Sequence, residues 1–419
     1  QLENFARLTH TPFGYFFLRE PPEVTLPVPD FRTVRDQILA EPSTSLLDMI
    51  YLCQQRQSWY RDYARLQGLP PLPFIGSVEP EQRPEVVAES IRETLLLTPS
   101  ERQAVPNWET ALRQLIRKTE DAGILVMTSS VVGSNTHRAL DVGEFRGFVL
   151  ADELAPLIFL NGADSKSAQM FTLGHELAHL WLGETGVSDV QAGRVPTQRI
   201  EHWCNRVAAE LLVPLKVLRS AYQRDASVAD EIQRLARLFK VSTLVALRRL
   251  FDAGYIDQDT LWQQYRQEEA RLRKPKEKRG DGGNPYRTIP ARASKRFSRA
   301  IISSALEGMT SFSEANRLLG VRKTATFDKL ARELGVTVWA ICWMPTSSLR
   351  PAACTMVLIF ARHSGTGWFT KATRARYSVS TRLPMRSTPA ATRFRNGRKA
   401  RVNISSSVHL PPWDRSSRR

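Results

Sequence analysis

His175 and His179 lie four residues apart in the run His-Glu-Leu-Ala-His, and this spacing constrains the chain more than any other feature. Residues four apart project from the same face of an α-helix, so both imidazoles can reach one cation. Zinc binds histidine nitrogens and, with three protein ligands, keeps a fourth position for water. Glu176 is rotated away from the first histidine, where it can accept a proton from that water. The spacing predicts a zinc site with Glu176 as the general base.

The residues around this motif favour a buried helix. Asp164 or Ser165 is a suitable N-cap, and Gly183 is a suitable stop after the last apolar position. An amphipathic surface helix with two solvated histidines is the alternative. Histidines set among apolar side chains in the middle of a helix need a polar partner, and a metal ion provides one. We therefore favour the metal site. The apolar positions are Met170, Phe171, Leu173, Leu177, Leu180 and Trp181.

A third ligand is expected from the helix predicted over residues 201–214, where apolar residues are followed by a proline. Glu201 opens this run and is the best candidate. Asn205 lies one turn later on the same face, where it can orient the Glu201 carboxylate or another ligand from behind. The predicted ligand set is therefore His175, His179 and Glu201.

Three other residues of the same run have ligand chemistry. Glu210 comes nine residues after Glu201 and therefore points to a different face of the helix. His202 and Cys204 do not share the Glu201 face either. A single cysteine among Val, Ala and Leu is usually a small buried apolar residue. Glu210, His202 and Cys204 are kept as alternatives to Glu201.

Short apolar runs precede the metal helix, each bounded by Gly, Asp or Asn, as is typical of strands. They span residues 123–127, 145–150 and 155–160, and the acidic pair at 152–153 indicates a hairpin between the last two. We expect the last strand to form the sheet edge beside the metal, where an extended peptide can pair with it. Alternatively, the strands only cover the core. The predicted substrate-binding residues are Leu157, Ile158 and Phe159.

The residues on both sides of the metal motif resemble a known family. Met-Phe-Thr-Leu-Gly at 170–174 precedes the motif, and Glu-x-x-Cys-Asn-x-x-Ala-Ala-Glu-Leu-Leu-x-Pro at 201–214 follows it. Together they resemble the ImmA/IrrE family of bacterial zinc metallopeptidases, closely over 120–255 and more weakly over 1–336. The resemblance implies an α+β fold, in which a small zincin-like domain with a short mixed sheet is embedded in a mainly helical chain. It also implies Zn2+ held by His175, His179 and Glu201, with Glu176 as general base.

The same resemblance implies two kinds of function. Members of the family cleave or inactivate repressor proteins in mobile elements or stress responses, and some lie beside toxin genes as antitoxins or regulators. We expect a zinc-dependent endopeptidase whose substrate is a protein such as an XRE-type repressor. The alternative is a non-catalytic regulator or antitoxin, with a cognate toxin as partner, that keeps the metal fold for binding.

Residues 1–120 are expected to be mainly helical and to carry the remnant of a DNA-binding domain. Residues 1–18 resemble the last helix of an XRE-type helix-turn-helix domain and the segment after it. Because the helices that read DNA would precede residue 1, we expect DNA binding only through a region that is incomplete here. Helices are predicted near 31–41, 44–66, 84–97 and 107–122.

Residues 232–251 read as two helices, the second capped by Ser242. This pattern fits a helix-turn-helix whose second helix, with Arg248 and Arg249, would enter a major groove. It also fits a pair of helices packed on the peptidase through leucines. Two arginines supply few phosphate contacts, so we favour the packed pair. The peptidase domain would then span residues 121–256.

The remaining chain divides by composition. We expect a charged linker at 257–285 and a small helical unit at 286–336. Residues 337–419 hold 15 Lys and Arg and a single acid, Asp414, so they supply +14 of the net charge of +17. This tail is either a basic arm that binds nucleic acid nonspecifically or an out-of-frame translation product. The family resemblance fades after Val336, which favours the second interpretation, and we expect disorder in both cases.

Length and cysteine usage set the remaining limits. A chain of 419 residues exceeds what one core usually serves and indicates two or three units. Cysteines without a pairing pattern indicate a reducing compartment. The sequence shows no leader and no apolar run of membrane length, so we expect a cytoplasmic protein without a membrane partner. The four cysteines are Cys53, Cys204, Cys342 and Cys354.

Overall fold

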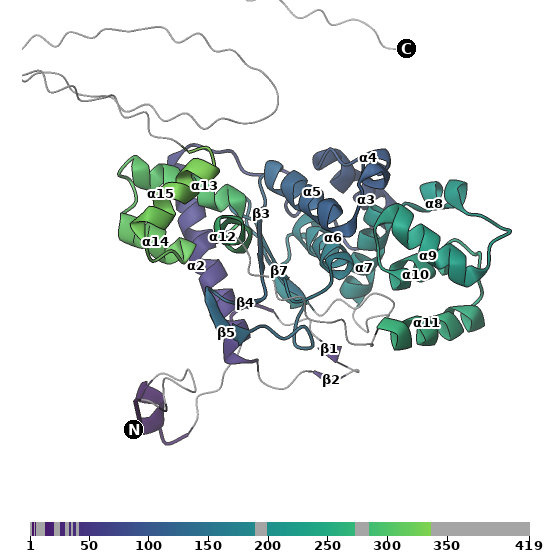
Figure 1. Ribbon diagram of the computed structural model, residues 1–419, viewed down its shortest axis with the longest axis horizontal. Coiled ribbons are helices and arrows are strands. Elements are labelled where there is room, and N and C mark those ends of the chain that lie inside the picture. The colour runs from purple at the N-terminus through teal and green to yellow at the C-terminus, as the bar shows by residue number, and fades with distance from the viewer. Residues whose placement is uncertain are drawn as a thin grey trace, which may run out of the picture. The chain divides into compact units, whose positions relative to one another are not determined.

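A four-stranded mixed sheet organises the part of the chain that the structure describes (Figure 1). Across the sheet the order is β3 (Leu125–Ser129), β7 (Leu157–Asn161), β6 (Gly147–Leu150) and β8 (Gly186–Ser188). β3 and β7 are parallel, whereas β6 is antiparallel to β7 and to β8. The antiparallel pairing of β6 with β7 confirms the predicted hairpin.

The structure is a computed structural model. It describes residues 42–188, 199–272 and 285–336, and in the N-terminal part the short segments 2–3, 5, 13–20, 26–29, 33–34 and 37–38. The predicted basic tail at 337–419 and half of the predicted XRE remnant at 1–18 lie outside the described residues. Among the described residues, no helix combines the length and the apolarity needed to cross a lipid bilayer.

Both faces of the sheet are buried, which explains why its strands are nearly continuous apolar runs rather than alternating ones. Every residue of β6 and of β7 is buried. Alternate side chains enter two different cores, because successive residues of a strand point to opposite faces. Val126, Val149 and Ile158 contribute to the first core. Leu125, Phe148 and Phe159 contribute to the second core.

The first core holds the metal motif. It lies between the sheet and a group of helices in which α6 (Lys166–Leu182) contacts α7 (Arg199–Leu212), α5 (Trp108–Asp121), and the strands β6 and β7. The other helices of this side pack on one another as well as on α6 and α7 (Figure 1). They are α3 (Pro84–Thr94), α4 (Pro99–Ala104), α8 (Leu215–Ala221), α9 (Val228–Phe239), α10 (Thr243–Asp252) and α11 (Gln258–Leu272).

The second core joins the start and the end of the described chain. The helix α2 (Thr44–Leu66) lies on this face with α12 (Pro285–Ala293), α13 (Lys295–Leu306), α14 (Phe312–Leu319) and α15 (Thr324–Glu333) (Figure 1). Phe297, Ile301 and Phe327 share this core with the Phe148 and Phe159 side chains of the sheet. The predicted helical unit at 286–336 is therefore present, but it packs on the sheet instead of forming a core of its own.

Buried polar side chains fasten these helices to the sheet. Arg56 on α2 donates to the carbonyl oxygens of Leu318 and Arg292, each at 2.9 Å. Glu120 at the end of α5 accepts from the Ser294 hydroxyl at 2.6 Å and from the Lys295 N–H at 2.7 Å. Its carboxylate thus binds the free N–H groups at the start of α13. These contacts cross the boundaries that the sequence predicts at 120/121 and 285/286.

Two sequence predictions on secondary structure are wrong. The helix predicted near 31–41 is absent, because Thr33–Val34 (β1) pairs in antiparallel fashion with Gln37–Ile38 (β2); β-branched residues favour such strands. The linker predicted at 257–285 is a helix over its first half, α11, because Leu261 is buried in the first core. Residues 273–284 lie outside the described residues.

Smaller elements complete the described chain. The strands β4 (Val131–Val132) and β5 (Asn135–Ala139) form an antiparallel hairpin, whose β5 residues are largely exposed. A short 3-10 helix, η1, spans Phe13–Phe17. Cys53 and Cys204 are buried free thiols, whereas Cys342 and Cys354 lie outside the described residues.

Candidate metal centre

The helix α6 carries the His-Glu-x-x-His motif through the middle of the first core. Of the two predicted N-caps, Ser165 is the one observed, and its side chain accepts from the Ala168 N–H. The helix ends at Gly183, whose φ of +75° is the left-handed conformation that glycine adopts without strain. His175 and His179 are both fully buried. A surface helix with solvated histidines, the alternative considered for the sequence, is therefore excluded.

Glycines allow α6 to approach its neighbours closely. An added Cβ at Gly147 on β6 would lie 2.6 Å from Thr172 Cγ2 and 3.0 Å from Glu176 Oε1. On the opposite side, an added Cβ at Gly174 would lie 3.4 Å from the Cβ of Ala208 on α7. These close approaches place the metal motif between β6 and α7.

The structure brings the three predicted ligands together. His175 Nε2 and His179 Nε2 are 3.0 Å apart. Glu201 Oε1 lies 3.0 Å from His179 Nε2, and Glu201 Oε2 lies 3.2 Å from His175 Nε2. All three side chains are buried, and their ligand atoms converge within 4.8 Å of one another.

This arrangement fits a tetrahedral zinc ion. Zinc–nitrogen bonds of roughly 2.0–2.1 Å separate two tetrahedral ligand atoms by about 3.3 Å, close to the spacings of 3.0 and 3.2 Å seen here. In the described chain, the ion pairs of Glu201 run only to His175 and His179. Among the described residues, no lysine or arginine pairs with this buried carboxylate, and a metal ion would supply the positive charge.

The protonation of the cluster points the same way. Burial opposes the ionisation of Glu201, but the two imidazoles outweigh it and hold the pKa of Glu201 well below its usual value. Burial lowers the pKa of His175. Burial also acts to lower the pKa of His179, but Cys204, Glu184 and Glu201 together raise that pKa well above its usual value. Metal ligands bind in their deprotonated form, so a metal ion that binds here would displace protons from the cluster.

Both histidines have a polar partner at the ring nitrogen that faces away from the cluster. His175 Nδ1 lies 3.0 Å from Asn205 Oδ1. Of the two ligands that Asn205 was predicted to support, it therefore contacts the histidine and not the Glu201 carboxylate. His179 Nδ1 lies 3.4 Å from Glu184 Oε2. Glu184 was not among the predicted residues. The only signal for it is that it directly follows the glycine that ends α6.

Glu176 borders β6, where an added Cβ at Gly147 would lie 3.0 Å from its Oε1, and it is close enough to His179, Glu201 and Ser188 for all three to affect its pKa. Its side chain is fully buried, and burial raises its pKa to about 8, while His179 and Ser188 act in the opposite direction. A carboxyl group with a pKa near neutrality can both accept and return a proton. Ser188, on β8, is a second neighbour that the sequence pattern did not reveal.

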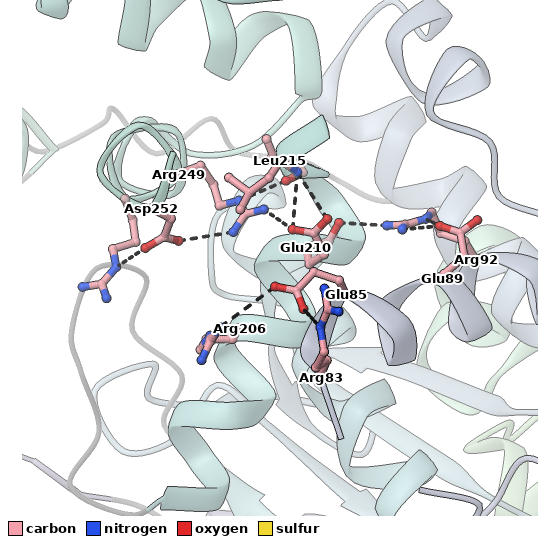
Figure 2. A network of polar contacts seen from close by, with 11 residues as sticks. Arg83, Glu85, Glu89, Arg92, Arg206, Glu210, Leu215, Arg249 and Asp252 are labelled. Carbon is pink, nitrogen blue, oxygen red and sulfur yellow. Dashed lines mark hydrogen bonds and ion pairs between the residues drawn. The ribbon is translucent and has the colours of Figure 1, made fainter. Parts of the chain in front are cut away.

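Glu210, the main alternative to Glu201, belongs to a different network (Figure 2). Its carboxylate forms a buried ion pair with Arg249 and accepts from the Leu215 N–H at 3.2 Å. Arg249 also lies 3.2 Å from Asp252 and donates to the Val213 carbonyl at 3.0 Å. Glu210 is therefore not available as a metal ligand. His202 and Cys204 are not members of the His175, His179 and Glu201 group either.

The same network decides between the two interpretations of the helix pair at 232–251. Arg249 is buried, and Arg248 lies 3.2 Å from Asp252. Leu235, Leu247 and Leu250 are buried in the first core. The structure therefore agrees with the packed pair, because Arg249, one of the two arginines that a recognition helix would present, is buried within the protein.

The predicted substrate strand requires a correction. Leu157, Ile158 and Phe159 lie on β7, which is bonded on both sides, to β3 and to β6. All three residues are fully buried. A strand with two neighbours has no free backbone groups for a peptide, so these residues cannot bind substrate by strand pairing. The edge strand beside Glu176 is β8.

Comparisons with known proteins agree with this site. The family model described as "IrrE N-terminal-like domain" matches residues 119–251. A second model, "Domain of unknown function (DUF8813)", matches residues 293–333, which cover α13 to α15. The radiation response metalloprotease IrrE of Deinococcus radiodurans is 32% identical over 99 residues, which are 22% of this chain and 30% of that protein.

The chain thus spans less than a third of the curated relative that it matches. Within the matched region lie α6 and α7, with His175, Glu176, His179 and Glu201. The fold around them is a small mixed sheet with the His-Glu-x-x-His helix packed on it. These matches support the assignment of residues 119–251 to the ImmA/IrrE family of metallopeptidases.

Proposed function

We propose that this chain is a zinc-dependent endopeptidase that cleaves a protein substrate, with an XRE-type repressor as the expected class. The observation that carries the proposal is the convergence of His175, His179 and Glu201, with Glu176 beside them. These three residues would hold the ion. When bound there, zinc supplies a Lewis acid that polarises the scissile carbonyl and increases the acidity of water.

The residues of the chain supply the proton transfers and the substrate contacts. Glu176 accepts a proton from the attacking water at a carboxylate oxygen and returns it to the leaving amine. Burial raises the pKa of Glu176 to about 8 when no ion is bound, which strengthens this carboxylate as a proton acceptor. The positive charge of a bound ion would lower this pKa and favour the base form.

An extended peptide would pair with the edge strand β8 rather than with β7. The Val187 N–H on this strand donates to the Pro29 carbonyl at 3.0 Å, so the segment at 26–29 already occupies one backbone position. A peptide that pairs along β8 would compete with this contact.

The test compares wild type with Glu176→Gln on a library of internally quenched peptides, both proteins loaded with zinc. We expect cleavage by wild type and a loss of at least about 100-fold in the variant, the usual contribution of a general base. Glu153→Gln, which alters an exposed acid on the loop between β6 and β7, is the matched control and should cleave normally. Equal rates for wild type and Glu176→Gln would show that Glu176 is not the base.

A non-catalytic regulator or antitoxin is the second candidate, and one observation favours it. The helices α12 to α15 are part of the described fold but lie outside the residues that match the metallopeptidase family model, so they offer surface for a role other than catalysis. In a repression or toxin-neutralisation assay, such a regulator would be unaffected by Glu176→Gln. A peptidase would lose its effect.

A further inference from the structure

We infer that Glu184 is a positioning residue for His179, whose Nδ1 its carboxylate holds so that Nε2 faces the metal centre. This inference rests on the zinc-dependent function proposed above and concerns how that site retains its ion. It assigns a role to an acid outside both the His-Glu-x-x-His motif and the α7 helix.

The two nitrogens of His179 face different partners. Nε2 lies 3.0 Å from His175 Nε2 and 3.0 Å from Glu201 Oε1, so it points into the shared cluster. Nδ1 lies 3.4 Å from Glu184 Oε2. A neutral imidazole that offers Nε2 to a metal carries its proton on Nδ1, and a carboxylate oxygen accepts that proton in a hydrogen bond. His179 Nδ1 and Glu184 Oε2 are both buried, although the Glu184 side chain as a whole is 33% exposed, and their 3.4 Å separation is an ion-pair contact longer than a well-formed N–H···O hydrogen bond.

The turn after α6 brings Glu184 back to His179. Gly183 adopts the left-handed conformation, and the Glu184 N–H then donates to the His179 carbonyl at 3.0 Å. This is the backbone pattern by which a glycine-terminated helix returns the next residue toward its last turn. A residue five positions after the histidine therefore lies beside the histidine ring.

A second loop fixes this turn from outside. The Gly76 N–H donates to the Leu180 carbonyl and the Val78 N–H to the Trp181 carbonyl, both at 3.1 Å. An added Cβ at Gly183 would lie 3.0 Å from the Gly76 Cα, so the two backbones are in direct contact. Because the loop at Gly76 and Val78 holds the last turn of α6, the Glu184 backbone has a defined position beside His179.

The two histidines thus have chemically different supports. His175 has the neutral amide of Asn205 at 3.0 Å, whereas His179 has a carboxylate. A carboxylate makes the imidazole a stronger donor to a metal than an amide does. The Cys204 thiol is also a neighbour of His179. Glu184 supplies the carboxylate that faces Nδ1 of His179.

The experiment measures zinc affinity of the full chain by competition with a chromophoric chelator, which requires no substrate. Glu184→Ala should weaken zinc binding about 10- to 100-fold, the usual effect of losing such a partner. Glu184→Gln keeps an acceptor but loses the charge, so its affinity should fall between those of wild type and Glu184→Ala. Glu79→Gln changes an exposed acid on the loop that carries Gly76 and should bind like wild type.

Nitrogen-15 NMR of the histidine rings gives a second readout that a merely structural role would not move. In zinc-loaded wild type, the Nδ1–H signal of His179 should indicate a strong hydrogen bond, and Glu184→Ala should shift this signal while leaving that of His175 in place. If Glu184→Ala does not fold, Glu184→Gln carries the test, with a several-fold loss of affinity expected.

The outcomes separate this inference from the proposed function. If wild type binds zinc and a folded Glu184→Ala or Glu184→Gln binds it equally well, the role of Glu184 is wrong and the peptidase proposal stands. If wild type binds no zinc, both are wrong. If zinc affinity falls as expected but no peptide is cleaved, the role of Glu184 stands and the peptidase proposal is the one that fails.

Discussion

Glu201 and Glu210 lie nine residues apart on the same helix, both largely buried, and their surroundings give them different chemistry. Glu201 meets two imidazoles, His175 and His179. Glu210 meets the guanidinium of Arg249 (Figure 2). The sequence offers both carboxylates as ligands, and only their partners distinguish them.

The different chemistry of Glu201 and Glu210 follows from whether the neighbouring side chain can release a proton. Arginine keeps its charge at any physiological pH, so the Glu210–Arg249 pair is closed to a metal ion. Histidine gives up its proton near neutral pH, so the proton between His179 and Glu201 can be exchanged for zinc. A buried carboxylate is a candidate metal ligand when its neighbours are titratable, and a structural group when its neighbour is a permanent cation.

The largest expected effect is on zinc affinity, which should depend on Glu201 but not on Glu210. Glu201→Gln removes the only charged ligand of the cluster, so zinc affinity should fall by more than about 100-fold, because even supporting residues outside the ligand set contribute 10- to 100-fold. Glu210→Gln should leave zinc affinity within about twofold of wild type, since Glu210 lies outside the cluster. Competition with a chelator measures the zinc affinity of both variants. Comparable losses would show that Glu201 and Glu210 do not differ in their role at the metal.

The second prediction concerns stability, for which Glu210 should matter more than Glu201. Glu210→Ala leaves the buried Arg249 without its main carboxylate, and breaking such a pair costs about 3 kcal/mol of the free energy of unfolding. Urea unfolding of the metal-free protein measures this cost. Replacing both residues, Glu210→Leu with Arg249→Met, should recover most of the loss, because no buried charge is then unpaired. A double variant as unstable as Glu210→Ala would mean that packing, not charge, governs this region.

A third buried carboxylate extends the comparison, because Glu176 lacks an arginine partner. Its folded-state pKa is about 8, above the usual 4.5, so the folded state binds this proton more tightly than the unfolded state. The free energy of unfolding therefore falls as pH rises from about 4.5 to 8. Glu176→Gln removes this penalty and should stabilise the metal-free protein by about 4 kcal/mol at pH 8 and little at pH 4.5, since the pKa rises from 4.5 to about 8 and each pKa unit corresponds to about 1.4 kcal/mol.

Urea unfolding at several pH values tests this sign. A stabilisation that is equal at pH 4.5 and pH 8 would show that the effect of Glu176→Gln comes from packing rather than from ionisation.

The smallest expected effect concerns the exposed edge of the Glu210 network. Arg206 lies 4.0 Å from Glu85, and both side chains are well exposed to solvent. Exposed pairs of this kind contribute about 0–1 kcal/mol, so Arg206→Ala should change the free energy of unfolding by less than about 0.5 kcal/mol. An effect as large as that of Glu210→Ala would show that the network acts as one unit across its exposed and buried parts.

The local features of the site follow from the sequence because they depend on neighbours along the chain. The spacing of His175 and His179, the cap at Ser165 and the stop at Gly183 are properties of one helix, and the structure has all of them. Placing Glu201 beside them required a second helix. The family resemblance and the opposite facing of Glu210 indicated it, and the observed geometry agrees.

The errors arise where distant segments meet. The strand at 157–161 was placed at the sheet edge because it directly precedes α6, but β3 pairs with it from more than 25 residues earlier in the chain. Likewise, the helices after residue 285 look separate in the sequence, whereas α2 and the sheet supply the other half of their core. Hydrophobic periodicity shows that a face is buried, but not which segment covers it.

The sequence by itself therefore determined the chemistry of this protein: two imidazoles on one helix face, a carboxylate between them, and a helix with a further carboxylate downstream. The tertiary structure alone decided which carboxylates face the imidazoles, that Glu184 returns to His179 through the turn at Gly183, and that β8 is the edge strand beside Glu176. The reason is physical. Helical spacing is fixed by local backbone geometry, whereas the partner of a buried charge is fixed by how distant elements pack.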